Sequence, residues 1–157
     1  MPTITTFLTY DDQAEEAVDF YTSIFENSRI LSKNYYGDAG PGPTGSLMTA
    51  TFELEGHEFV ALNGGPSFSF SQGISLLVSC ETQEEVDRLW ERLSDGGKQG
   101  PCGWLTDKFG VSWQVVPRVL PQLLNDPDPV KSQRVMSAML QMRKIEIAEL
   151  ERAYQSA

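Results

Sequence analysis

Apolar and polar residues alternate at two spacings along the first half of the chain. Apolar residues at every second position are typical of half-buried β-strands, and strand patterns cover 3–10, 29–36, 46–54 and 58–62. Between the first two strands, apolar residues fall at helical spacing from Ala14 to Phe25, with Asp11 or Asp12 as the N-cap. The pattern predicts a βαβββ module in this half.

The second half repeats this order of elements. Strand patterns cover 72–79, 98–105 and 110–116. A helix is predicted after Thr82, which forms a capping box with Glu85, and Gly96 is expected to end it. A shift of about seventy residues superposes the two patterns. We therefore predict an α+β fold in which one domain, 1–117, holds two βαβββ modules, about 1–66 and 67–117. Their strands are expected to form one mixed sheet curled into a cup, with the helices outside.

Beyond Pro117 the chain leaves the repeat, and 118–157 is predicted as a C-terminal helical extension. A short helix is expected before Asn125, and a longer one begins at Asp128-Pro129, where aspartate caps and proline starts a helix. The segment 144–147 is predicted to interrupt it. The apolar face of the longer helix holds Val135, Met136, Met139 and Leu140. Such a face covers either its own sheet edge or a partner subunit, and we expect the partner.

The last strand of the repeat has two different faces. Val111, Trp113 and Val115 form an apolar face, which we expect to lie under a helix. Ser112 and Gln114 lie on the other face, which suits a ligand, water or another polar strand.

Aligning the turn glycines Gly56 and Gly110 matches Val60 of the first module with Gln114 of the second. Alternation then places Phe59 under a helix and its neighbours on the inner face. The residues expected to face a cavity between the modules are Thr6, Glu58 and Gln114.

The 157 residues carry a formal net charge of −10, from 22 acidic and 12 basic side chains. Nucleic-acid binding requires clustered lysine and arginine, so this charge argues against that function. Two cysteines form no disulfide framework, no apolar run reaches the ~20 residues of a membrane helix, and the first residues lack the pattern of a signal peptide. We expect a cytoplasmic protein that binds neither nucleic acid nor membrane.

Three further positions are candidates for chemistry or binding. Cys102 is either a nucleophile, which requires a neighbouring base, or an unreactive thiol; we favour the thiol because the only histidine, His57, sits at a hairpin turn. Asn63 begins a glycine-rich loop whose backbone amides either meet a ligand or form a sharp turn. Trp104 either walls an apolar pocket or packs in the core.

Several motifs occur in an order that resembles a known family. They are Phe20-Tyr21, Leu62-Asn63-Gly64-Gly65-Pro66, Glu85-Val86-Asp87, Leu89-Trp90, Cys102-Gly103-Trp104 and Gly110-Val111-Ser112-Trp113-Gln114. Together with the paired modules, they make the chain similar to the PhnB-like family of the vicinal oxygen chelate superfamily of glyoxalase, bleomycin-resistance and dioxygenase proteins. Members of this family are often labelled 3-demethylubiquinone-9 3-methyltransferase. The resemblance covers nearly the whole chain and implies a homodimer.

The resemblance also implies positions for a divalent metal on the first and last strands of each module. These positions fall on Thr6, Val60, Ile74 or Leu76, and Gln114. A catalytic metal needs about three imidazole, carboxylate or thiolate ligands, and Gln114 alone offers a usable oxygen. A Rossmann-type methyl-donor site needs a glycine-rich turn where this chain has Tyr10-Asp11-Asp12. We therefore expect neither a metal nor another cofactor.

Two classes of function remain. The first is metal-independent binding of a small organic molecule, apolar or cationic, in the cup between the modules. The alternative is an enzyme of the superfamily, of lyase, isomerase or transferase type, in which Gln114, Glu58 or Cys102 acts on a small organic substrate. The residues expected to contact the ligand are Thr6, Glu58, Val60, Asn63, Trp104 and Gln114.

Overall fold

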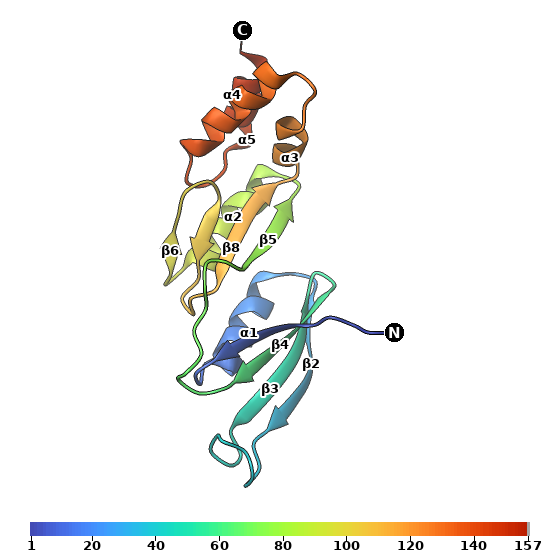
Figure 1. Cartoon of the computed structure of the whole chain (residues 1–157), viewed down its shortest axis with the longest axis vertical. Helices are drawn as coiled ribbons and strands as arrows, with labels where there is room; N and C mark the ends of the chain where they lie inside the picture. The colour runs from blue at the N-terminus through green and yellow to red at the C-terminus, as the bar shows by residue number, and fades with distance from the viewer. Residues whose placement is uncertain (157) are drawn as a thin grey trace. The chain divides into compact units, whose positions relative to one another are not determined.

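The computed structural model describes residues 1–156, which divide into two compact units (Figure 1). Unit 1 is Met1–Phe70, and unit 2 begins at Ser71 and includes the C-terminal helices. Each unit contains one four-stranded mixed sheet with one helix packed on it. The predicted α+β fold of two βαβββ modules with C-terminal helices is confirmed. The expectation of one mixed sheet is wrong, because the described strands pair only within their own module and form two four-stranded sheets. The shared cup stays a prediction.

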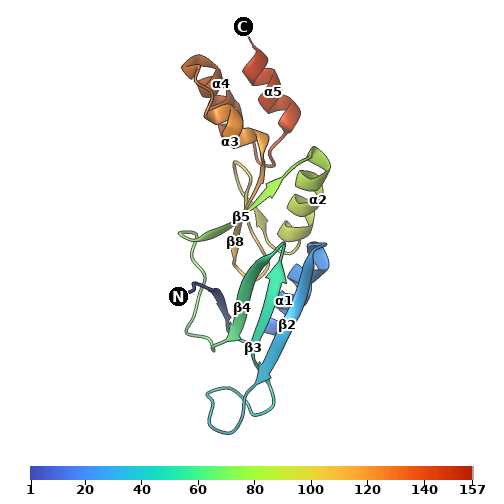
Figure 2. The same ribbon diagram turned by 90° about the vertical axis from the view of Figure 1, so that its right-hand side faces the viewer.

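Unit 1 contains one helix and four strands, visible in Figure 2: β1 Thr6–Tyr10, α1 Ala14–Ile24, β2 Ser28–Tyr35, β3 Leu47–Leu54 and β4 His57–Asn63. The strand order is β1-β4-β3-β2. β1 runs parallel to β4, and the other neighbours are antiparallel. The β3–β4 hairpin turns at Glu55 and Gly56, which both have positive φ, as the predicted turn requires.

Helix α1 covers one face of this sheet and forms the core of unit 1. Tyr21 of α1 stacks on Phe52 of β3, and Phe52 stacks on Phe59 of β4. The hydroxyl of Tyr10 in β1 donates to the hydroxyl of Tyr21 at 3.3 Å. Phe59 is buried on this face, as its alternation predicted. We call the face without the helix the open face of the sheet.

Unit 2 repeats the same connections: β5 Ser75–Cys80, α2 Gln83–Ser94, β6 Lys98–Gln99, β7 Trp104–Thr106 and β8 Ser112–Pro117. The order is β5-β8-β7-β6, with β5 parallel to β8 and the other pairs antiparallel. Thr82 caps α2 by accepting from the backbone N–H of Glu85, as predicted. The predicted internal repeat is therefore confirmed at the level of strand pairing.

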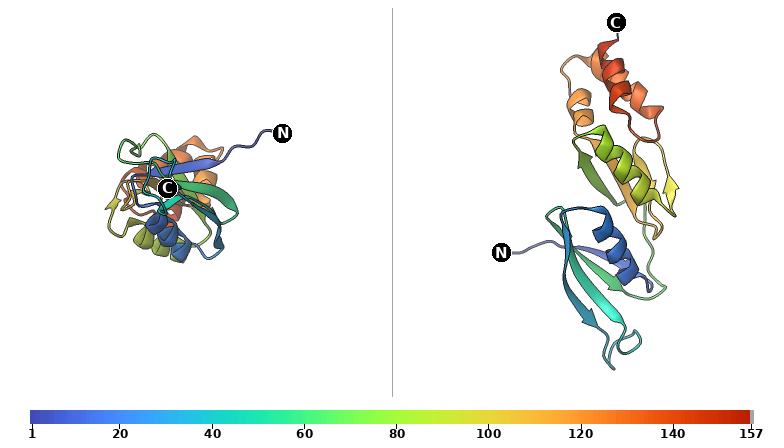
Figure 3. Two further views of the ribbon diagram at one scale, coloured as in Figure 1. Left: turned by 90° about the horizontal axis from the view of Figure 1, so that it is seen from below. Right: turned by 180° about the vertical axis from the view of Figure 1, so that it is seen from behind.

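Helix α2 covers one face of the second sheet (Figure 3). Trp113 and Val115 of β8 are 2% and 0% exposed, whereas their neighbour Gln114 is only half-buried. The Trp113 indole donates to a carboxylate oxygen of buried Asp107 at 2.9 Å, and the other oxygen accepts from the backbone of Phe109 and Val111. The predicted register of the last strand, with Trp113 on the helix side, is confirmed.

The extension consists of α3 Val119–Leu124, α4 Pro129–Leu140 and α5 Ile147–Gln155. The Asp128 carboxylate caps α4, and the chain leaves the helix before Lys144, as predicted. These helices form a small core of their own, with the following residues buried: Leu120, Val135, Ile145 and Leu150. Met139 packs against this core from within the same chain, whereas Leu140 is 57% exposed. Met139 is only partly buried by this core, so the expectation that this face lies against a partner stays a prediction.

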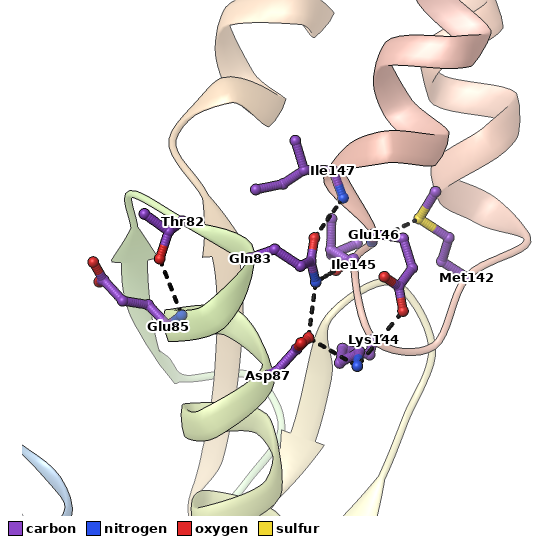
Figure 4. A network of polar contacts seen from close by, with 9 residues as sticks. All are labelled: Thr82, Gln83, Glu85, Asp87, Met142, Lys144, Ile145, Glu146 and Ile147. Carbon is purple, nitrogen blue, oxygen red and sulfur yellow. Dashed lines mark hydrogen bonds and ion pairs between the residues drawn. The ribbon is translucent and has the colours of Figure 1, made fainter.

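The chain between α4 and α5 is fastened to the start of α2 by a network of polar contacts (Figure 4). The Gln83 amide donates to the carbonyl of Ile145 at 3.0 Å and accepts from the N–H of Ile147 at 2.7 Å. Lys144 forms an ion pair with Asp87 at 2.8 Å. Hydrogen bonds from Gln83 and then Lys144 lower the pKa of Asp87. Unit 2 therefore includes the extension as a docked part.

Among the described residues, no helix combines the length and the apolar character that crossing a bilayer requires.

Candidate functional site

The open face of the second sheet carries the polar strand positions predicted to meet a ligand. Gln114 pairs with Trp104 of β7 and Leu77 of β5, so their side chains share this face. Ser112 pairs with Thr106 in the same way. The Gln114 amide donates to the hydroxyl of Ser75 at 3.0 Å, so Gln114 has a partner in the protein.

A cavity of about 490 Å³ opens on this face beside β6, β7 and β8. Its lining consists of Gln72, Lys98, Gln99, Gly100, Pro101, Trp104, Leu105, Thr106 and Ser112. The predicted Trp104 lines it, and the predicted Gln114 does not. Ligand pockets for small molecules commonly measure about 300–1,000 Å³ and combine apolar walls with a few polar groups. The cavity fits this description.

Ser112 is the most informative residue of the cavity. Its side chain is 2% exposed, and its hydroxyl finds no hydrogen-bond partner among the described residues. A buried hydroxyl without a partner costs about 1–3 kcal/mol, so native proteins rarely keep one. The alternation of β8 had placed Ser112 on the ligand-facing side, but no local pattern could show that its hydroxyl would be left unbonded.

The charge at this cavity is opposite to that of the whole chain. Lys98 is the one charged side chain among the described residues that line it, although the chain carries a formal net charge of −10. A lysine ammonium beside an otherwise neutral wall attracts anions. The expectation of a cationic ligand, drawn from the overall charge, therefore does not suit this cavity.

In unit 1, Glu58 and Val60 lie on the open face, as expected, because they alternate with buried Phe59. The expected position of Thr6 is wrong. Thr6 pairs with Phe59 in β4 and therefore lies on the helix side, at an exposed edge where its hydroxyl is 3.3 Å from His57 Nε2. Phe7 occupies the open face instead and is 57% exposed.

Asn63, predicted to contact a ligand, has its side-chain amide occupied by the fold. Its Oδ1 accepts from the N–H of Ala14 at 2.8 Å, which caps α1 in place of the expected Asp11 or Asp12. Its Nδ2 donates to the carbonyl of Leu47 at 3.1 Å. The first bond ties the end of β4 to the start of α1, and the second ties it to the start of β3.

The backbone N–H groups of the glycine-rich loop after Asn63 are also bonded within the fold. The N–H groups of Gly64 and Gly65 donate to the carbonyls of Tyr10 and Asp11, so they stabilise a turn and point at no ligand. Gly65 has φ of 92°, which a side chain would strain. Of the two interpretations left open, the sharp turn is correct.

A larger cavity in unit 1, of about 740 Å³, lies beside this loop. The charged residues among its described lining are Asp11, Asp12 and Glu15. Asn63 also lines it, but both ends of its amide are already bonded. Within residues 1–156, no buried side-chain nitrogen or oxygen without a partner lines this cavity. The cavity in unit 2 is therefore the better candidate.

The two cysteines lie in different environments. Cys80 is fully buried in β5, and burial, followed by the negative charge of Glu85, raises its pKa to about 11. Cys102 is half-buried in a turn and has φ of 57°. Its backbone N–H donates to the carbonyl of Met142 at 2.8 Å.

The positions implied for a metal do not supply suitable ligands. On the open faces, these positions hold Phe7, Val60, Leu77 and Gln114. Leu77, and not Leu76 as expected, shares the face of Gln114; Leu76 pairs with Trp113, and Ile74 precedes the strand. One amide oxygen among apolar side chains does not bind a divalent ion well. Within residues 1–156, no three histidine, cysteine or acidic residues gather in a potential metal site.

The paired modules define the class of protein: the chain has the glyoxalase-like fold of the vicinal oxygen chelate superfamily. The family model described as 3-demethylubiquinone-9 3-methyltransferase matches residues 2–116, and the chain belongs to this PhnB-like family. It is 41% identical to a putative 3-demethylubiquinone-9 3-methyltransferase, PhnB protein, from Bacillus cereus, with a TM-score of 0.66, covering 74% of this chain and 99% of that one.

Two more distant structures show the same fold. A protein from Pseudomonas aeruginosa is 22% identical, with a TM-score of 0.61, covering 74% of this chain and 98% of that one. The fosfomycin resistance protein FosX from Listeria monocytogenes, complexed with Mn(II) and dihydroxypropylphosphonic acid, is 17% identical, with a TM-score of 0.60, covering 80% and 99%. No curated protein matches the chain in sequence.

A methyl-donor cofactor, which the family description implies, does not fit the start of the fold. The turn after β1, residues 11–13, contains no glycine, and the carbonyls of Tyr10 and Asp11 are bonded to the loop after β4. A Rossmann-type site needs a glycine-rich turn at this point, where the backbone can approach the cofactor closely. We derive no methyl-transfer step for this chain.

Proposed function

We propose that this protein binds a small organic molecule, without a metal ion, at the open face of its second sheet. The observation that carries the proposal is the buried Ser112 hydroxyl without a partner in a cavity of about 490 Å³. A ligand that accepts a hydrogen bond from Ser112 would remove the cost of that unbonded group.

The chemistry of the lining narrows the class of ligand. The Trp104 side chain offers an aromatic surface against which a planar ring can pack. Lys98 favours a neutral or anionic molecule over a cationic one. We therefore propose a planar, ring-containing molecule with a carbonyl or carboxylate oxygen at the Ser112 end.

Three compounds with one ring and different charges test this proposal: benzamide, benzoate and benzylamine. Binding is followed by the indole N–H signal of Trp104 in ¹H–¹⁵N NMR spectra, which a Trp104→Phe variant identifies among the signals of 3 tryptophans. Benzoate and benzamide should shift this signal, and benzylamine should bind weakest. The titrations should be run with and without divalent ions, and the ions should make no difference.

Removing the Ser112 hydroxyl should change two measurable quantities in opposite directions: the stability of the free protein and its affinity for benzamide. Ser112→Ala should raise the free energy of unfolding of the free protein by about 1 kcal/mol, because it removes a buried group without a partner. It should weaken benzamide binding about threefold to tenfold, since one net hydrogen bond of ~0.5–1.5 kcal/mol is lost. Ser79→Ala, at an exposed position of β5, is the matched control and should change neither quantity.

The proposal is wrong if none of the three compounds shifts the Trp104 signal up to about 10 mM, the range of very weak binding. It is also wrong if Ser112→Ala destabilises the protein and leaves benzamide affinity unchanged, because the hydroxyl would then have a partner within the fold.

A further inference from the structure

One wall of the cavity is a loop that is held from behind by the C-terminal extension. Gln99, Gly100 and Pro101 line the cavity, and the loop continues through Cys102 and Gly103 into β7. The matched family region ends at residue 116. The chain that contacts this loop, the α4–α5 connection of residues 141–146, therefore lies outside the matched region.

The contacts between loop and connection are made mainly by backbone groups. The N–H of Cys102 donates to the carbonyl of Met142 at 2.8 Å, and the N–H of Gly103 donates to the carbonyl of Arg143 at 2.7 Å. In the opposite direction, the Arg143 guanidinium donates to the carbonyl of Gln99, a residue of the cavity wall. Three hydrogen bonds thus join 99–103 to 142–143.

The loop also has a conformation that needs such support. Cys102 and Gly103 have φ of 57° and 83°, and positive φ is unfavourable for a cysteine. A Cβ at Gly103 would lie 2.8 Å from the carbonyl oxygen of Val115 and 3.1 Å from the Ile145 side chain. The loop therefore fits tightly between β8 and the buried Ile145 of the connection.

The connection is in turn anchored to α2. Gln83 bonds to the backbone of Ile145 and Ile147, and Lys144 pairs with Asp87 (Figure 4). A segment held at one side by α2 and at the other by three bonds to the loop is suited to fix the position of the loop.

We propose that the α4–α5 connection sets the position of the cavity wall, and that Arg143 is a positioning residue for the ligand. This inference rests on the proposed function, because it concerns the same cavity. It adds that ligand affinity depends on a segment that the family region does not include.

The test uses the full-length chain with Arg143→Ala. Arg143 is exposed, so the variant should fold and keep the thermal midpoint of the parent. Amide hydrogen exchange at Cys102 and Gly103 should become faster, and the Kd for benzamide should rise about fivefold, as expected when one charge-assisted bond that holds the wall is lost. Arg143→Lys should restore part of the affinity, because an ammonium group also donates to the Gln99 carbonyl.

Arg152→Ala is the matched control, since Arg152 lies on α5 of the same extension and pairs with Glu149 at the surface. It should change neither the exchange rates nor the Kd. If Arg143→Ala behaves like Arg152→Ala while Ser112→Ala still weakens benzamide binding, the inference is wrong and the proposed function stands. If none of the three compounds shifts the Trp104 signal of the unmodified protein, both are refuted.

Discussion

Replacing Trp113 by phenylalanine tests the orientation of the last strand, on which the location of the open face depends. Trp113 is 2% exposed on the helix side of the second sheet, and its indole N–H donates to a carboxylate oxygen of Asp107 at 2.9 Å. Asp107 is itself 2% exposed. The substitution keeps an aromatic ring in the core but removes the donor.

The magnitude follows from two contributions. A hydrogen bond to a charged group contributes about 1.5–3 kcal/mol, and its loss leaves a buried carboxylate oxygen short of one donor. Exchanging an indole for a phenyl ring leaves a small cavity, which adds about 1 kcal/mol. We expect Trp113→Phe to lower the free energy of unfolding by about 2–4 kcal/mol, a large share of the ~5–15 kcal/mol of a typical domain. Trp113→Ala should cost more, at least ~3–5 kcal/mol.

Urea unfolding followed by far-UV circular dichroism measures this difference without relying on tryptophan fluorescence. Trp104→Phe is the matched control: Trp104 is half-buried on the open face, so the same exchange should cost less than ~1 kcal/mol there. In an Asp107→Asn background, Trp113→Phe should cost about 1–2 kcal/mol less, because the charged acceptor is already gone. Equal costs for Trp104→Phe and Trp113→Phe would refute the face assignment.

Three further predictions follow from single contacts. Gln114→Leu should change the free energy of unfolding by less than ~1 kcal/mol in a thermal-shift assay, because Gln114 bonds to half-exposed Ser75. It should change benzamide affinity by less than about twofold in an NMR titration, because Gln114 does not line the cavity. A thiol reagent at pH 8 should modify Cys102 and spare the buried Cys80, and modification of both cysteines in the native protein would contradict this. Because burial raises the pKa of Cys80 to about 11, its neutral thiol stabilises the fold below pH ~9, and this contribution is lost as the pH rises toward 11. A homodimer stays a prediction: light scattering should give twice the chain mass, and serine at the exposed α4 positions Val130 and Leu140 should give a monomer.

Much of the fold could be predicted from local patterns, because the contacts that form these elements are made by residues close together in the sequence. Alternation in β8 separated Trp113 from Gln114, since a strand with one apolar face has one stable orientation. The cap at Thr82 and the start at Asp128-Pro129 follow from side chains that bond to helix ends in any context. The repeat of βαβββ order then indicated how the strands of each module pair.

For Thr6, alternation along the strand does not decide which face of β1 meets the helix. Both faces of β1 carry one large apolar residue or more, so the pattern alone does not decide which face meets the helix. Parallel pairing decides it: Thr6 lies beside Phe59, and Phe59 is buried under α1 with Phe52. This information comes from a strand about fifty residues away in the sequence.

The features that matter most at the candidate site also depend on distant parts of the chain. Asn63 caps a helix that begins 49 residues earlier, so its amide serves the fold. The wall at Gln99 is bonded to Arg143, which is 44 residues later. Ser112 is buried between Thr106 of β7 and Ser75 of β5, and its hydroxyl has no partner among the described residues. The sequence by itself determined the two modules, the faces of β8 and the starts of α2 and α4, because each follows from contacts between near neighbours. Tertiary packing decided the faces of β1, the bonding of the Asn63 amide and the lack of a partner for the Ser112 hydroxyl, because each depends on residues distant in the sequence.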